Sequence, residues 1–224
     1  MNTFNQFFFG IYPYICLAVF FLGSLMRFDR EQYTWKSDSS ELLYRGQLRL
    51  GSVLFHVGVL AVFFGLLAPL WFWEFIGVSH QAKQITAMTA GGIFGSAALA
   101  GLIILIRRRF KIERISVNST WRDKLVLIWI LITLLLGLST IVVSMGHLDG
   151  HEMVKLMQWA QHIVTFRGGA ASYLEDVNFL FKMHIFMGMT FFLIFPFTRM
   201  VHVWSGFGAL SYIPRAWQLV RRRR

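Results

Sequence analysis

Five separate runs of predominantly apolar residues constrain this chain more than any other feature. They cover approximately residues 4–26, 52–73, 85–106, 125–145 and 179–204. Each run has a length of about 20 residues, which is the length that an α-helix needs to cross the hydrocarbon core of a bilayer. Only 15% of the 224 residues are charged, whereas about 25% is usual in soluble domains. The sequence therefore predicts an all-α integral membrane bundle of five spans, forming a single domain over residues 1–224.

The basic residues predict the orientation of these spans. Of the 22 Lys and Arg residues, all but four follow the first span, follow the third span or lie at the C-terminal end. Cytoplasmic segments carry the excess of Lys and Arg in membrane proteins, so we expect the N-terminus outside and the C-terminus in the cytoplasm. In a soluble chain, a net charge of +11 would suggest a nucleic acid partner. Here the excess of Lys and Arg in the cytoplasmic segments explains the net charge, and no nucleic acid partner is predicted.

Three local features refine this topology. Cys16 is the single cysteine, so the chain alone offers no disulfide, iron–sulfur or cysteine zinc site, and we expect a packed thiol. The start of the chain lacks a basic region and a cleavage site, which predicts that the first span is retained. The external loop 146–178 contains "MVKLMQWAQHIVTF", whose spacing predicts an amphipathic surface helix. In the third span, the small residues Gly91, Gly95, Ala98 and Gly101 predict close approach of a neighbouring helix.

Two histidines flank an apolar stretch of the fifth span, "HIFMGMTFFLIFPFTRMVH". His184 and His202 are eighteen residues apart, which is five turns and about 27 Å of a continuous α-helix. They are therefore predicted to leave one face of one helix, near opposite sides of the membrane. His56, in "LFHVGVL", lies one turn inside the cytoplasmic boundary of the second span. Because the second and fifth spans are antiparallel, His56 and His202 are expected at the same depth.

Two imidazoles at one depth on facing helices are the arrangement required for bis-histidine ligation of a b-type haem. A hydrogen-bonded structural pair or a proton relay is the alternative for such histidines. The arginines at this depth are Arg107, Arg108, Arg109 and Arg199. Any of them could hold the haem propionates by charge-assisted hydrogen bonds, although anchoring of the topology explains each of them singly as well.

The chain resembles the gamma subunit of respiratory nitrate reductase, a membrane cytochrome b that oxidises quinol. The resemblance runs nearly end to end, through "FFFGIYPYICLAVFFLGSLMRFDREQYTW", "LFHVGVL", "AMTAGG", "WAQHIVTFRGGA" and "FPFTRMVHVWS". It implies two b haems, one near the cytoplasm held by His56 and His202 and one near the outside with His184 as a ligand. It also implies quinol oxidation near the outer haem, with Lys83 at the position of a lysine linked to quinol binding.

The same resemblance implies the partners and the location of the protein. Electrons would leave inward to an iron–sulfur beta subunit and then to a molybdenum alpha subunit that reduces nitrate. The chain would then lie in the inner membrane of a prokaryote as a multi-pass protein. The loop "RFDREQYTWKSDSS" and the C-terminal "YIPRAWQLVRRRR" are the expected docking segments, and binding of lipid headgroups is the alternative role for their arginines.

The sequence departs from the family at the outer haem. The family has a second histidine ten residues after the first on span two, and this chain has Leu66 there, as if one helical turn were missing. His184 is left without an obvious partner. His80 or His147 could take the place of the missing ligand, while His151 and His162 are expected to be solvated. Otherwise the outer haem is five-coordinate, lost, or held by Met187 or Met189, which share the helix of His184 and are poorly placed.

Two other functions remain open from the sequence. A haem-free subunit could anchor a complex to the membrane without taking part in electron transfer. A haem b gamma subunit could also serve another quinone-linked oxidoreductase, such as a dehydrogenase that passes electrons toward quinone. The local motifs favour the nitrate reductase resemblance over both.

Overall fold

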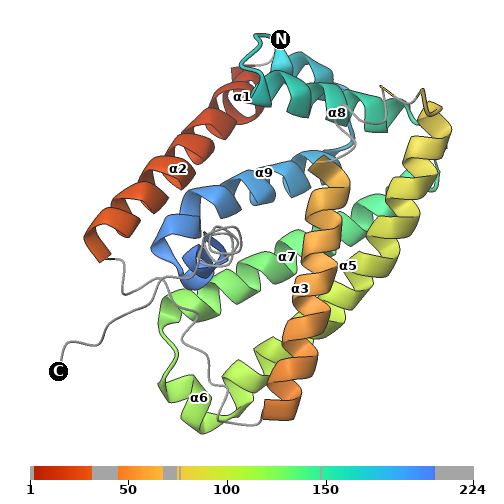
Figure 1. The fold of residues 1–224 in the computed structure, drawn as a ribbon. Coiled ribbons are helices and arrows are strands. Elements are labelled where there is room, and N and C mark those ends of the chain that lie inside the picture. Colours follow the sequence, from red (N-terminus) through yellow and green to blue (C-terminus); the bar gives the residue numbers. More distant parts are fainter. Residues whose placement is uncertain (1–2, 32–44, 68–74, 76, 147, 205–224) are drawn as a thin grey trace, which may run out of the picture.

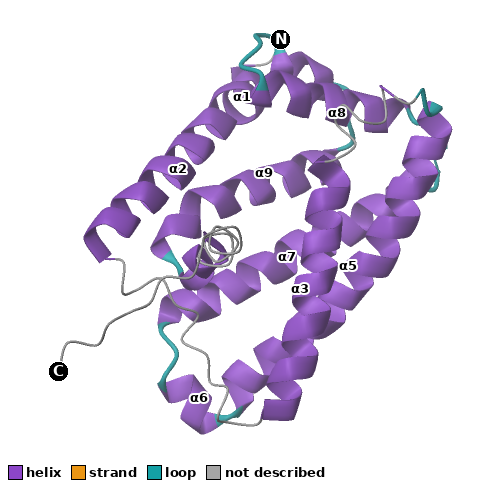
Figure 2. Ribbon diagram, in the orientation of Figure 1, coloured by secondary structure: helices purple, strands orange, loops and turns teal. Residues whose placement is uncertain are grey.

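The computed structural model describes residues 3–31, 45–67, 75, 77–146 and 148–204. These residues form helices and short connections, with no strand among them (Figure 2). The longer helices are α2 (Tyr12–Glu31), α3 (Arg45–Leu67), α5 (His80–Lys111), α7 (Trp121–Ser144), α8 (His151–Val164) and α9 (Phe179–Ile194). The shorter ones are α1 (Thr3–Gln6), the π-helix η1 (Phe7–Ile11), α6 (Glu113–Val117), and the 3-10 helices η3 (Ala170–Leu174), η4 (Phe195–Phe197) and η5 (Arg199–Val201).

Within the described residues, five helices are long and apolar enough to cross a bilayer, in agreement with the number and approximate positions of the predicted spans. The helices long and apolar enough to cross a bilayer are Thr3–Glu31, Arg45–Gly65, His80–Lys111, Trp121–Ser144 and Phe179–Phe197. Most of them extend beyond the predicted bounds, because the helices continue past the apolar run into polar flanks. Residues 68–73 of the predicted second span lie outside the described residues.

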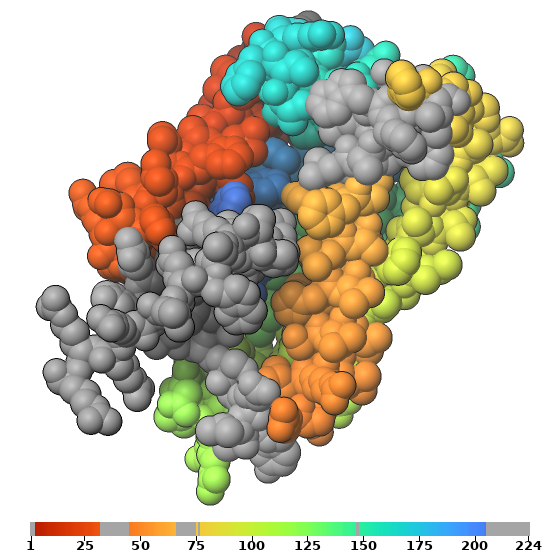
Figure 3. All heavy atoms as spheres, viewed as in Figure 1, coloured from red at the N-terminus to blue at the C-terminus, as the bar shows by residue number. Residues whose placement is uncertain are grey.

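The spans form a bundle closed at one end by a transverse helix (Figure 1). The helix α8 lies across this end, which we call the α8 end, and α6 lies at the opposite end, the α6 end. Neighbours pack in the order α3, α5, α7, α9 and α2. In the space-filling view, α2 lies at one edge of the face shown, and α3 and α5 lie toward the other (Figure 3). The most extensive packing in the bundle is between α3 and α5.

Small residues allow α3 and α5 to approach closely. A Cβ added to Gly58 would lie 2.5 Å from the Phe94 carbonyl oxygen, and one added to Gly101 would meet the backbone of Phe55. Ala98 is fully buried in the same contact. Gly95 faces another neighbour, since its added Cβ would lie 2.9 Å from Leu138 of α7. The predicted close approach along α5 is thus confirmed, and it serves two helices.

We predict that Gly58→Ala destabilises the bundle, because the added methyl group meets the α5 backbone, which has no flexible side chain that can move aside. Overpacking of this kind costs about 1–3 kcal/mol. Thermal unfolding in detergent should therefore show a lower Tm. Gly92→Ala is the matched control, since nothing lies within 4 Å of its added Cβ and alanine favours the helix. An equal decrease in both variants would contradict close packing at Gly58.

The α8 end has its own apolar core. The predicted amphipathic helix is confirmed as α8, His151–Val164, which buries Met157, Trp159 and Ile163. These side chains pack with Phe9 and Leu174 in one cluster, and Trp159 Nε1 donates a hydrogen bond of 2.9 Å to the Phe9 carbonyl oxygen within the π-helix η1. The α8 end is therefore tied to the first span. Cys16, further along this span, is fully buried as expected.

The fifth span is not one continuous helix, and the prediction that His184 and His202 share one helix face was wrong. The helix α9 ends at Ile194, and the chain passes through η4, an extended Thr198 (φ −119°, ψ 177°) and η5 before reaching His202. Pro196 explains the break, because proline lacks the N–H that would continue the helical ladder and its ring clashes with the preceding turn. His202 therefore belongs to a short irregular segment, Phe195–His202, which we call the post-α9 segment.

Candidate functional site

The structure brings His56, at the middle of α3, together with His202. His56 lies in α3, and His202 caps the C-terminal end of η5. Their ring centroids are 6.2 Å apart, and their planes are inclined at 72°. Two residues 146 positions apart in the sequence thus form one pair.

Each imidazole of this pair is oriented by a backbone carbonyl. The Nδ1 of His56 lies 2.7 Å from the Ser52 carbonyl oxygen, and the Nδ1 of His202 lies 2.7 Å from the Arg199 carbonyl oxygen. A carbonyl oxygen only accepts hydrogen bonds, so both Nδ1 atoms carry the proton and donate. In the neutral imidazole, this tautomer leaves Nε2 with the lone pair that a metal requires.

The spacing of the pair fits a shared metal. Two metal–nitrogen bonds of about 2 Å, with about 1 Å from each nitrogen to its ring centre, separate the centroids by about 6 Å. The observed 6.2 Å is close to the spacing of two rings whose Nε2 atoms both face one metal. Within the described ranges, no group of three or more His, Cys, Asp or Glu side chains could hold a metal ion alone. A haem needs only two axial protein ligands, because the porphyrin supplies the other four nitrogens.

The post-α9 segment that carries His202 is fixed to the first span. Arg27 Nη1 donates to the carbonyl oxygens of Pro196 at 2.7 Å and Thr198 at 2.6 Å. A Cβ added to Gly23 would lie only 3.0 Å from the Pro196 ring. Arg27, which the topology predicts on the cytoplasmic side, thus also donates hydrogen bonds to the carbonyls at the helix break.

A buried carboxylate holds the same segment from another helix. Asp123, only 4% exposed in the first turn of α7, has its Oδ1 2.8 Å from Arg199 Nε. Its Oδ2 accepts from the Thr120 backbone N–H and hydroxyl, both at 2.8 Å, in a capping box. Arg109 Nη1 lies 3.8 Å from the same Oδ2 and donates to Ser119 at 3.0 Å. One carboxylate therefore joins α5, α7 and the post-α9 segment.

The four arginines proposed for the propionates occupy different environments. Arg199 and Arg109 both have the Asp123 carboxylate as a partner. Arg108 is buried and Arg107 is exposed, on successive positions of α5. Propionate binding by these residues stays a prediction.

His184 lies in α9 and contacts α7. Its Nδ1 is 3.0 Å from the Thr133 carbonyl oxygen, and its Cε1 would lie 2.8 Å from a Cβ added to Gly137. The same Nδ1 arrangement as in His56 and His202 leaves Nε2 with its lone pair. Leu66, where the resemblance predicts the second ligand, lies in the last turn of α3. The outer haem site at His184 stays a prediction.

The remaining histidines that the structure describes, His80, His151 and His162, lie toward the α8 end. His80 is exposed at the start of α5 and His151 at the start of α8. His162 is half-buried, with its Nδ1 3.1 Å from the Gly168 carbonyl oxygen and its Nε2 3.2 Å from the Tyr173 hydroxyl. Both of its nitrogens are thus engaged. His147 lies outside the described residues.

Lys83 is buried, contrary to the usual solvation of a loop lysine. It lies in the first turn of α5 and is 6% exposed. The next residue, Gln84, donates to the Ser144 carbonyl oxygen at 3.2 Å and lines a cavity of about 210 Å³ that Glu152 and Asn178 also line. A buried ammonium group at the α8 end is the position expected for the quinol lysine, and that role stays a prediction.

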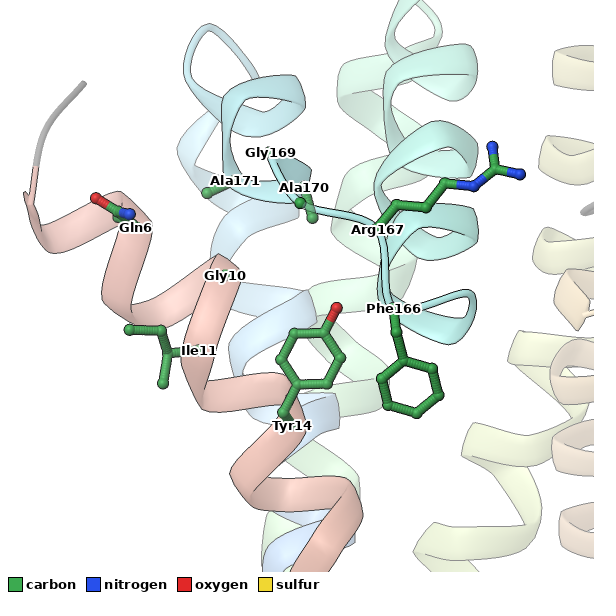
Figure 4. Close-up of a pocket in the computed structure, with 10 residues that line it drawn as sticks. Gln6, Gly10, Ile11, Tyr14, Phe166, Arg167, Gly169, Ala170 and Ala171 are labelled. Carbon is green, nitrogen blue, oxygen red and sulfur yellow. The ribbon is translucent and has the colours of Figure 1, made fainter.

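A second, wider cavity of about 560 Å³ lies between the first span and the loop after α8 (Figure 4). Tyr14 and Phe166 stack at its wall, with centroids 5.6 Å apart. Arg167 extends away from Gln6 and Tyr14 in this view. No histidine lines this cavity, so it is separate from the His56–His202 pair.

Comparison with known proteins decides the family. The model of the nitrate reductase gamma subunit family matches residues 5–223. This chain belongs to the nitrate reductase gamma subunit family. It is 46% identical to respiratory nitrate reductase 1 gamma chain of Escherichia coli K12 over 227 residues, covering 100% of both chains. It is 48% identical to the respiratory nitrate reductase 2 gamma chain of the same organism, covering 98% of each, and 36% identical to the nitrate reductase gamma chain of Bacillus subtilis 168, covering 98% of this chain and 99% of the relative.

As a gamma subunit, the chain is one part of an oxidoreductase complex. Its sequence also contains two signals that point to a structural role for Asp123 and that the sequence predictions did not include. Asp123 is the sole acidic residue in the first turn of an apolar span, and ionisable groups in spans usually have a partner and a role. The "TWRD" sequence also matches a capping box. Arg27 gave no such signal, because it resembles any cytoplasmic anchor.

The two docking segments predicted for the gamma subunit lie largely outside the described residues. Only residues 27–31 of the loop "RFDREQYTWKSDSS" belong to α2, and all of "YIPRAWQLVRRRR" falls within 205–224. Their role in binding the other subunits stays a prediction.

Proposed function

We propose that this gamma subunit is a membrane cytochrome b that carries electrons from quinol toward nitrate through a haem b held by His56 and His202. The observation that carries the proposal is the pair itself, with centroids 6.2 Å apart and each Nδ1 on a backbone carbonyl. A structural hydrogen-bonded pair would direct one imidazole N–H at the other ring. Here both N–H groups are used by Ser52 and Arg199, which favours metal ligation.

Each part of the site would contribute separately. When bound, a b-type haem supplies one-electron redox chemistry. His56 and His202 would hold the haem iron, and the carbonyls of Ser52 and Arg199 would keep both imidazoles in the ligating tautomer. The post-α9 segment presents His202 to α3. His56 is exposed and His202 is half-buried in the bundle.

The direction of electron flow rests on the charge distribution. The basic residues concentrate at the α6 end, which we propose faces the cytoplasm, so the His56–His202 pair lies on the cytoplasmic side. Lys83, at the opposite end, would stabilise the negative charge that develops on a quinol oxygen as its proton leaves to the outside. Electrons would then pass inward to an iron–sulfur beta subunit and a molybdenum alpha subunit, in the inner membrane of a prokaryote.

Redox spectroscopy of the purified complex tests this function. We expect at least one haem b per gamma subunit, reduced by added quinol and reoxidised by nitrate. A Soret band of zero intensity would overturn the proposal in favour of a haem-free anchor. Oxidation of the haem by quinone, with dehydrogenase subunits in the purified complex in place of nitrate reductase subunits, would instead establish the other quinone-linked class.

A separate prediction concerns the outer haem. If His184 holds it, the wild-type protein contains two haems b per chain and His184→Ala contains one, as measured by the pyridine haemochrome assay against protein concentration. His162→Ala serves as the control, because both nitrogens of His162 are engaged by Gly168 and Tyr173, and we expect its haem content to equal the wild type. A ratio of one in both the wild type and His184→Ala would refute the outer haem and leave the His56–His202 site intact.

A further inference from the structure

We propose that Arg27 and Asp123 are positioning residues that set the orientation of His202 through the post-α9 segment. This inference rests on the proposed function, in which His202 is a haem ligand. It concerns two side chains that would touch neither the iron nor the quinol, and that reach His202 from α2 and from α7.

The first step is the state of the backbone at the helix break. In an α-helix the Pro196 carbonyl would accept from Met200 N–H and the Thr198 carbonyl from His202 N–H. Instead Met200 N–H donates to the Thr198 hydroxyl at 3.2 Å, and His202 N–H donates to the carbonyls of Arg199 and Met200. Both helical acceptors have thus lost their usual donors.

Arg27 takes up these two acceptors. Its Nη1 donates to the Pro196 oxygen at 2.7 Å and to the Thr198 oxygen at 2.6 Å. Hydrogen bonds from a charged donor are about twice as strong as neutral ones. Since the two carbonyls lie on either side of the break, the guanidinium fixes the angle at which η5 leaves α9.

The second step is the path from Asp123 to the imidazole. Asp123 Oδ1 pairs with Arg199 Nε at 2.8 Å, and the carbonyl of the same Arg199 accepts from His202 Nδ1 at 2.7 Å. One residue therefore connects the buried carboxylate to the ring. A shift of Arg199 moves the carbonyl that orients His202 and so rotates the imidazole plane.

Both anchors are needed because the post-α9 segment lacks a helical ladder of its own. The helix η5 has three residues, and 3-10 hydrogen bonds have poorer geometry than those of an α-helix. Asp123, by contrast, is fixed by its capping box at the start of a 24-residue helix. The segment thus takes its position from α2 and α7.

The expected consequence is altered axial geometry with the haem retained. The g-values of low-spin ferric haem depend on the angle between the two imidazole planes, and the midpoint potential depends on the hydrogen bond to the ligand Nδ1. We therefore expect Arg27→Gln and Asp123→Asn to shift the largest g-value and the midpoint potential of the cytoplasmic-side haem, at unchanged haem content.

The experiment compares each variant in the whole complex with a matched control. Arg30→Gln removes an exposed positive charge one turn from Arg27, and Glu113→Gln removes an exposed negative charge from α6 while keeping Asp123 and its capping box. We expect both controls to retain the wild-type g-value and potential, and Arg27→Lys to fall between Arg27→Gln and the wild type. If Asp123→Asn fails to assemble, the Arg27 series decides alone.

The outcomes separate this inference from the function on which it rests. Wild-type spectra in Arg27→Gln and Asp123→Asn would overturn the positioning role and leave the haem site standing. Shifts of equal size in Arg30→Gln and Glu113→Gln would overturn it as well, since the change of net charge would then explain them. Unchanged haem content in His202→Ala would instead refute the proposed function.

Discussion

Replacing His202 with alanine is expected to remove the cytoplasmic-side haem b and to lower the rate of quinol-dependent nitrate reduction by more than about 100-fold. Even outer-shell partners of metal ligands cost about 10–100-fold when replaced, and His202 would be a ligand itself. His56→Ala should give the same loss, because the two imidazoles, 6.2 Å apart, would hold one iron between them. The pyridine haemochrome assay and the Soret band measure the loss.

His151→Ala is the matched control for both ligand variants. Its side chain is 75% exposed, at the α8 end of the bundle, so its haem content and activity should equal those of the wild type. An artificial donor that reduces the partner subunits directly should still support nitrate reduction in every variant. If His202→Ala retains its haem, or if only one of the two variants loses it, ligation by this pair is refuted.

Replacing Lys83 with methionine is expected to lower kcat/KM for quinol by about 100-fold, with the haem content unchanged. Preorganised groups that stabilise a developing oxyanion contribute about 2.7–4 kcal/mol when removed singly. Lys83 is only 6% exposed, so water screens its charge less than that of a surface lysine. Steady-state quinol oxidation and the rate of haem reduction by quinol measure the effect.

Lys155→Met controls for the loss of one positive charge at the same end of the bundle. Lys155 lies in α8 and is half-buried, and we expect its kcat/KM to stay within about twofold of the wild type, as for a charge outside the site. Equal losses in both variants would show that Lys83 acts through the overall field at this end. A normal kcat/KM in Lys83→Met would remove it from the quinol site.

The features that could be predicted from the sequence are those that follow from hydropathy and from the depth of each residue in the membrane. The number of spans, the amphipathic α8 and the close approach at Ala98 and Gly101 all come from periodic patterns of apolar or small residues. The proximity of His56 and His202 followed from antiparallel topology alone, although the reasoning assumed an unbroken helix. It succeeded because the break after Ile194 leaves His202 at the same end of the bundle.

The remaining details depend on tertiary contacts that no local pattern specifies. Pro196 marked a possible break, but a proline in a span can also kink a helix and let it continue. The partners of Arg199 and Arg109 depend on Asp123, which is in a different span from either. The burial of Lys83 likewise follows from how the first turn of α5 packs, and the hydrogen bonds of His162 follow from the turn at Gly168.

Because the helix is interrupted after Ile194, a movement of one half of the fifth span is not passed directly to the other half. A rigid rod would transmit any rotation or slippage at His184 directly to His202. Because the helical hydrogen bonds stop at Pro196, the half that carries His184 can change its position while Arg27 and Asp123 hold the other half in place. A change in packing around His184 would therefore leave the position of His202 unaltered.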